Sequence, residues 1–161
     1  MDFDRFFQAE HDSLLRMCWG VTTDRELARD VAQETMCRAY ERWDIVGGAG
    51  SNPAAWGRTV ALNLVRSNWR RARTATLAEP VLRAGLRVAT DAPVDADLVA
   101  ALRSLADRQR EAVVLHHLLD LSVGDCAEAM ELSESSVKAH LRRGRARLSE
   151  LLGMTEQEAH A

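Results

Sequence analysis

Apolar side chains recur every three or four residues along most of this chain, which is the spacing of an amphipathic helix. In the N-terminal part the pattern predicts helices over residues 3–21, 24–43 and 53–73. Between the second and third of these, the sequence "VGGAGSNP" contains three glycines and interrupts the periodicity. The N-terminal part therefore predicts a small helical bundle with one glycine-rich loop.

Two short stretches indicate where these helices begin. At "TDRE", residues 23–26, the sequence has the form of a capping box, in which Thr23 caps the free amides and Glu26 reaches back. Asn52 followed by Pro53 is a second start signal, because Asn accepts hydrogen bonds from first-turn amides and Pro suits the first helical position.

The C-terminal part follows a stretch, residues 74–97, that contains the other two prolines and little periodicity. This composition is typical of a linker. Beyond it, leucines and valines predict two helices, a third that begins at Ser122, a turn "ELS" at 131–133, and a final helix over 134–148. A short helix, a tight turn and a second helix predict a helix-turn-helix.

The predicted fold class is all-α, with two small helical domains joined by a flexible linker. The predicted segments are an N-terminal helical bundle (1–73), the linker (74–97), a C-terminal helix-turn-helix domain (98–153) and a tail (154–161).

The composition of the chain argues against several classes of protein. No apolar run approaches the ~20 residues of a membrane span. The N-terminus lacks the apolar core of a signal peptide, so we expect a cytoplasmic protein without membrane insertion. The cysteines (Cys18, Cys37 and Cys126) are far apart, which predicts buried structural thiols rather than a disulfide framework or a zinc site.

The charge of the chain is unevenly distributed. The formal net charge is −3, yet residues 51–73 contain five arginines and no acid, and residues 135–149 contain five bases and no acid. Two basic islands in an acidic background indicate contacts with a polyanion at particular places.

The second island lies on the predicted helix 134–148. On a helical wheel its apolar residues share one face, while small and cationic side chains occupy the other. Small residues let a helix approach bases, and long cations reach guanine edges or phosphates. Pairing of Lys with Glu one turn away cannot account for a stretch without acids. The candidate DNA contacts are Ser135, Ser136, Lys138, Ala139, His140, Arg142, Arg143 and Arg145.

The first island lies on the predicted helix 53–73. Thr59, Asn63, Arg66, Arg70 and Arg73 form one polar stripe, and an apolar stripe of Ala55, Leu62, Val65 and Trp69 lies apart from it. Asn can read base edges and Arg can hold phosphates, whereas Trp69 can either stack on an unpaired base or pack in the core.

Three segments resemble RNA polymerase sigma factors of the extracytoplasmic-function branch. They are "ELARDVAQETMCRAYERW" (26–43), "NPAAWGRTVALNLVRSNWRRAR" (52–73) and "LRSLADRQREAVVLHHLLDLSVGDCAEAMELSESSVKAHLRRGRARLSELL" (102–152). They occur in the order of that family and cover nearly the whole chain. The chain departs from the pattern at Leu105–Ala106, where the family often has Leu-Pro, and in the glycine-rich loop, so the −10 base preference stays open.

The resemblance implies partners and roles. The exposed side of helix 24–43 would dock on the clamp helices of the polymerase β′ subunit, through Asp30, Gln33, Glu34 and Arg38. The C-terminal domain would contact the β flap and read the −35 element of promoter DNA. An anti-sigma factor is a further implied partner. Loop 45–52 and helix 53–73 would bind the −10 element through Gly47, Gly48, Ser51, Asn52, Arg58, Thr59, Asn63, Arg66, Trp69, Arg70 and Arg73.

Two other classes compete with this interpretation. A stand-alone helix-turn-helix regulator would dimerise and bind palindromes, but it leaves the stripe on helix 53–73 unexplained. An enzyme or metal protein is disfavoured, because the histidines do not cluster with cysteines and His117 is expected in the core. We therefore expect no catalytic residues, metal or cofactor. An acidic body with two basic islands is also expected to bind free DNA poorly until polymerase fixes their separation.

Overall fold

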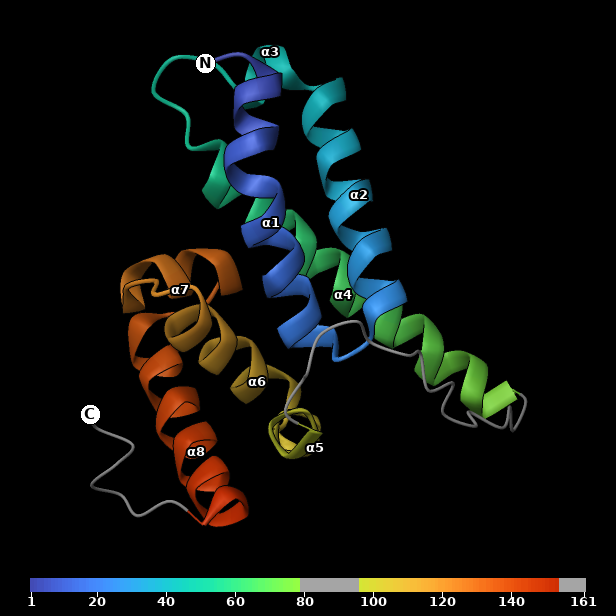
Figure 1. Cartoon of the computed structure of the whole chain (residues 1–161), viewed down its shortest axis with the longest axis vertical. Helices are drawn as coiled ribbons and strands as arrows, with labels where there is room; N and C mark the ends of the chain where they lie inside the picture. The colour runs from blue at the N-terminus through green and yellow to red at the C-terminus, as the bar shows by residue number, and fades with distance from the viewer. Residues whose placement is uncertain (79–95, 154–161) are drawn as a thin grey trace.

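A computed structural model describes residues 1–78 and 96–153, so most of the predicted linker and the predicted tail lie outside the described residues. Within these ranges every regular element is a helix, which confirms the all-α class (Figure 1). The elements are α1 (Phe3–Thr22), α2 (Arg25–Glu41), α3 (Trp43–Val46), α4 (Pro53–Ala78), α5 (Ala96–Ser104), α6 (Asp107–Val113), a π-helical turn η1 (Val114–Leu118), α7 (Val123–Met130) and α8 (Glu134–Leu152).

The N-terminal helices form one packed group. Helices α1 and α2 lie side by side, and α4 crosses behind them (Figure 1). Their contact faces are apolar: Met17 on α1 and Leu62 and Val65 on α4 are completely buried, and Met36 on α2 is nearly so. This burial, rather than helix propensity alone, stabilises the group.

Helix starts follow the sequence signals with one exception. The Asn52 side chain accepts a hydrogen bond from the Ala55 amide at 3.0 Å, as expected of an N-cap. The capping box at Thr23 is wrong: Thr23 ends α1 in the left-handed region, at φ 53°, and Asp24 caps α2. Thr23 and Asp24 can both form helix caps and are adjacent in the sequence. Thr23 ends α1, and Asp24 begins α2.

The C-terminal helices form the predicted helix-turn-helix. Ser122 caps α7 through the Asp125 amide at 3.0 Å, and Ser133 caps α8. Val137 and Leu141 of α8 are buried, as the wheel predicts. Gly144 brings α8 close to α6, because a Cβ on Gly144 would lie only 2.8 Å from Cγ2 of Val113.

The expectation that His117 lies in the core is wrong, since its side chain is exposed. The chain makes a π-helical turn at η1, where the Leu119 amide donates to the Val114 carbonyl at 3.2 Å. One extra residue per turn changes the direction of the side chains that follow, so the apolar spacing read as one regular helix does not place His117 inside.

Two predicted boundaries shift. Helix α4 continues past Arg73 to Ala78, and α5 begins at Ala96 rather than Leu98. Helices α6 and α7 and the turn η1 pack against α1 and α4, so the two predicted domains contact each other directly through these elements (Figure 1).

Candidate nucleic-acid interface

The outer face of α8 presents cations and small side chains to solvent. Ser135, Lys138, Arg142 and Arg143 are exposed, and Arg145 is half-buried. Within the part of the chain that the structure describes, none of these four cations forms an ion pair. Their charge is therefore available to an external anion. The other predicted contacts of this helix, Ser136, Ala139 and His140, are half-buried beside them.

His140 lies where this face meets the domain body. Its Nδ1 atom is buried and has no hydrogen-bond partner among the described residues. Burial lowers the pKa of His140 below its ordinary value of 6.5, and the nearby charges of Arg143 and Arg108 lower it further. The imidazole is consequently neutral at pH 7, so it can offer base edges or backbone only a neutral hydrogen bond.

The stripe on α4 forms as predicted, but it does not face solvent along its length. Asn63, Arg70 and Arg73 are exposed, whereas Thr59 and Arg66 are half-buried. The Asn63 carbonyl oxygen accepts a hydrogen bond from Nη1 of Arg66 at 3.1 Å, and the Thr59 hydroxyl donates to the Ala55 carbonyl at 3.2 Å.

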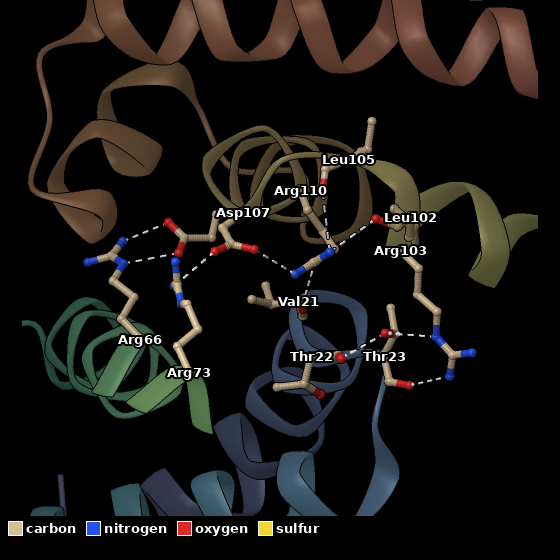
Figure 2. A network of polar contacts seen from close by, with 11 residues as sticks. Val21, Thr22, Thr23, Arg66, Arg73, Leu102, Arg103, Leu105, Asp107 and Arg110 are labelled. Carbon is tan, nitrogen blue, oxygen red and sulfur yellow. Dashed lines mark hydrogen bonds and ion pairs between the residues drawn. The ribbon is translucent and has the colours of Figure 1, made fainter. Parts of the chain in front are cut away.

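Two arginines of the stripe are held by carboxylates of α6. Arg66 donates from Nε and Nη2 to the two carboxylate oxygens of Glu111, at 3.0 and 2.7 Å. Nη2 of Arg73 lies 3.4 Å from a carboxylate oxygen of Asp107, and Figure 2 shows the two side chains pointing toward one another. Trp69 is half-buried under the guanidinium of Arg110, whose central carbon is 5.1 Å from the ring centroid. In this arrangement region 53–73 faces the C-terminal domain.

The loop before α4 is compact. A Cβ on Gly47 would collide with the ring of Trp43, so this position requires glycine for packing. Gly50 adopts a positive φ of 80°. The Ser51 hydroxyl lies 2.6 Å from the carbonyl oxygens of both Val46 and Gly48, which holds the loop closed. Gly48 is half-buried within it.

The four residues expected to bind polymerase lie together on the exposed side of α2: Asp30, Gln33, Glu34 and Arg38. Arg38 donates to Glu34 at 2.7 Å. Next to them is a groove of about 680 Å³ between α1 and α2, and its lining includes Phe3, Phe7 and Tyr40. Phe7 and Tyr40 are 39% and 67% exposed, which makes this the most aromatic open surface of the described chain.

Sequence reasoning missed the residues of α6. Glu111 is fully buried, and Arg110 is 7% exposed and donates to the Val21 carbonyl at 2.6 Å. The available signal was "RQREAVVL", in which one acid lies between two arginines and an apolar run. A buried acid in that setting needs a cationic partner, but the sequence does not identify Arg66, 45 residues away, as that partner.

Two of the cysteines are buried, and the described residues contain no cluster of metal ligands. In residues 1–78 and 96–153 there is no group of three His, Cys, Asp or Glu side chains placed to hold a metal ion. Burial raises the pKa of the Cys18 thiol to about 12 and that of Cys126 to about 11, so both are unreactive thiols in the core. No described helix is long and apolar enough to cross a membrane.

Comparison with known families identifies two matched regions. Residues 6–75 match the family model "Sigma-70 region 2", and residues 95–148 match "Sigma-70, region 4". The chain is 33% identical to the RNA polymerase sigma-E factor of Streptomyces antibioticus over its whole length, which covers 90% of that protein. It is 32% identical to the ECF RNA polymerase sigma factor SigM of Mycobacterium tuberculosis, covering 94% of this chain and 77% of that one.

Solved structures share the fold. The chain is similar to the sigma factor RpoE of Bartonella quintana, crystallised in complex with the anti-sigma factor NepR. The TM-score is 0.83 at 27% identity, over 96% of this chain and 99% of that one. CnrH in complex with the cytosolic domain of CnrY gives a TM-score of 0.69 at 24% identity, over 94% of this chain and 87% of that chain.

Proposed function

The chain belongs to the sigma-70 family, in its extracytoplasmic-function branch, and from that premise we propose how its residues divide the work of promoter recognition. As an alternative sigma factor it binds core RNA polymerase and directs promoter-specific initiation. Residues 1–73 act in polymerase binding and at the −10 element, residues 98–153 act at the −35 element, and the segment between them is the linker.

Helix α8 reads the −35 element in the major groove. The exposed side chains of Ser135 and Lys138 lie in its first two turns, where a recognition helix contacts base edges. Arg142, Arg143 and Arg145 lie one turn further along, where they hold phosphates. The close packing of α8 on α6 at Gly144 fixes the angle at which the cationic face of α8 meets DNA.

The loop 45–52 and α4 bind the opened −10 element. The loop holds a base flipped out of the non-template strand, and the positive φ of Gly50 gives the backbone a turn that most side chains disfavour. Asn63, Arg66, Arg70 and Arg73 follow the phosphate backbone of that strand along α4, and Trp69 supports a base by stacking. Arg58 and Thr59, half-buried near the start of α4, complete the surface next to the loop.

The exposed side of α2 docks on the clamp helices of the polymerase β′ subunit. Asp30, Gln33, Glu34 and Arg38 supply charge and hydrogen bonds there, and the aromatic groove beside them supplies apolar area. The C-terminal domain contacts the β flap. The chemistry of RNA synthesis belongs to the polymerase, so this chain needs no catalytic residue or cofactor and acts in the cytoplasm.

An anti-sigma factor is the proposed inhibitor. Two similar structures, RpoE and CnrH, are complexes: RpoE with the anti-sigma factor NepR, and CnrH with the cytosolic domain of CnrY. A partner of this kind would hold the two DNA-binding helices away from promoter DNA until a signal releases it.

The observation that carries the proposal is the pair of acid-free cationic stretches, one in each sigma domain of a single chain. The test is run-off transcription with sigma-free core polymerase and fragmented genomic DNA. Discrete 5′ ends that need the protein and share two upstream elements are expected. No transcripts and no co-elution with core would instead favour a stand-alone regulator.

Variants of α8 sharpen this test. Lys138→Ala is expected to reduce run-off product about 5- to 150-fold, since each good base contact contributes about 1–3 kcal/mol. Arg147→Ala is the matched control, because Arg147 already pairs with Glu150 at 3.1 Å. Equal losses in both variants would show a nonspecific charge effect and contradict the assigned roles.

A further inference from the structure

One buried ion pair joins the two domains. The Glu111 carboxylate is fully buried, and its partners are Arg66 across the interface and Arg108 on its own helix, the latter at 3.2 Å. Arg66 grips both carboxylate oxygens, which is the same fork geometry that Arg uses for a phosphate group. While Arg66 holds Glu111, it cannot hold DNA.

A second set of contacts joins the end of α1 to α5 and α6. Carbonyls in the last turn of a helix lack partners within the helix, and α1 has no basic residue there. Arg110 donates to the Val21 carbonyl at 2.6 Å, and Arg103 donates to the Thr23 carbonyl at 3.1 Å (Figure 2). Two arginines of the C-terminal domain therefore cap the end of an N-terminal helix.

The third contact is steric. Gly20 of α1 is buried, and a Cβ there would lie 3.0 and 3.1 Å from the methyl groups of Val114 and 3.2 Å from Leu118. Val114 and Leu118 belong to the π-helical turn, which packs against α1. Any side chain longer than a methyl group at position 20 cannot fit while the domains are together.

We propose that the free protein holds itself in a closed, autoinhibited state, in which α6 engages Arg66, Trp69 and Arg73 of the −10 face of α4 and Glu111 takes the place of a DNA phosphate at Arg66. This inference rests on the proposed role of α4. We call these contacts the interdomain latch: Glu111 with Arg66, Arg110 and Arg103 with the end of α1, and Gly20 with the turn η1. All of these groups belong to this chain. An anti-sigma factor or the polymerase would then act on a pre-existing equilibrium between closed and open states.

The composition of the latch suits a reversible contact. Its ion pairs and hydrogen bonds to carbonyls lie beside a continuous apolar core that spans both domains, and these polar groups can pair with water when the domains separate. When the domains separate, Glu111 keeps Arg108 and gains water, so opening leaves no unpaired buried charge on α6. Arg66 is then released for a phosphate.

Gly20→Gln is the variant that opens the latch without touching a proposed DNA contact. Gln favours a helix more than Gly does, so α1 itself is not weakened. Gly124→Gln is the matched control, since a Cβ at Gly124 of α7 meets nothing closer than 3.5 Å. Arg103→Ala is a second, milder variant on an exposed side chain, in case the first reduces folding.

The direct measurement is energy transfer between one dye on Cys37, which is exposed on α2, and one on Ala146→Cys of α8. High transfer is expected in the parent protein and in Gly124→Gln, and lower transfer in Gly20→Gln, with a smaller drop in Arg103→Ala. Circular dichroism checks that helix content is unchanged. Equally low transfer in the parent and Gly20→Gln would show that the free protein is not closed, and equally high transfer would show that the contact at Gly20 does not hold the domains together; either result would overturn the proposal.

Binding to DNA gives the second readout. The probe is a short single-stranded DNA pool of random sequence, because the latch competes for phosphate rather than for particular bases. Opening a state closed about 90% of the time raises apparent affinity about tenfold, and a gain of about this size is expected for Gly20→Gln. Lower transfer without a gain in affinity would refute occlusion of α4. Neither measurement involves polymerase, so a failure of run-off transcription would count against the proposed function alone.

Discussion

Replacing Gly144 with alanine is expected to weaken the packing of the recognition helix α8 against α6. The new Cβ would lie 2.8 Å from Cγ2 of Val113 and 3.4 Å from the Gln109 carbonyl oxygen. Val113 is 6% exposed and has a stiff, β-branched side chain, so it cannot rotate away freely. The contact must be relieved by moving α8 or by straining α6.

Two effects of opposite sign set the magnitude. Alanine gains about 0.8–1 kcal/mol over glycine in a helix interior. Overpacking a close-packed contact costs about 1–3 kcal/mol. The net expectation is a loss of about 0–2 kcal/mol in the free energy of unfolding of the C-terminal domain.

A double-mutant cycle isolates the contact. Val113→Ala alone is expected to cost about 1–3 kcal/mol, because it removes two buried methyl groups and leaves a cavity. In the double variant the methyl group added at position 144 no longer meets a Cγ2 atom at position 113. The two losses should therefore fail to add, with a favourable coupling of about 1–2 kcal/mol.

The assay is urea unfolding followed by circular dichroism. All four tryptophans lie in residues 1–73, so tryptophan fluorescence adds a second signal, from the N-terminal helices and from the contact of Trp69 with Arg110. Strictly additive losses would refute the claim that Gly144 is required by contact with Val113.

Three further outcomes are expected. Asn52→Ala should lower stability by about 1 kcal/mol in urea unfolding, because it removes the cap on the Ala55 amide; no change would contradict that role. Burial and the charges of Arg143 and Arg108 lower the pKa of His140, so the stability linked to this group is present above its unfolded pKa of 6.5 and is lost as pH falls through its folded pKa. His140→Gln should flatten the decline of the urea midpoint below pH 6.5, and an unchanged slope would count against this linkage. Finally, one thiol, Cys37, should react quickly with a disulfide reagent in the native protein, whereas fast reaction of two or three would contradict the burial of the others.

Local features were readable from the sequence. Asn52 and Ser122 begin their helices as predicted, because an N-cap depends on a few neighbouring residues. The apolar face of α8 was also correct, since Val137, Leu141 and Gly144 repeat at the helical period. Both cationic helices could therefore be placed from periodicity and charge alone.

Features that depend on contacts distant in sequence were not readable. The partner of Arg66 is Glu111, and no local pattern connects two residues 45 positions apart. The π-helical turn that exposes His117 depends on how α6 packs against α1 and α8, which helical spacing does not encode. The choice between Thr23 and Asp24 as the cap of α2 depended on where α1 ends.

The central claim is that the two cationic faces read two different promoter elements. The most direct test is run-off transcription with paired changes in protein and promoter. On a promoter whose −35 element has been scrambled, Lys138→Ala should cause no further loss, while Asn63→Ala should still reduce transcription. On a promoter with a scrambled −10 element the pattern should reverse. Losses that multiply independently on every template would contradict the account.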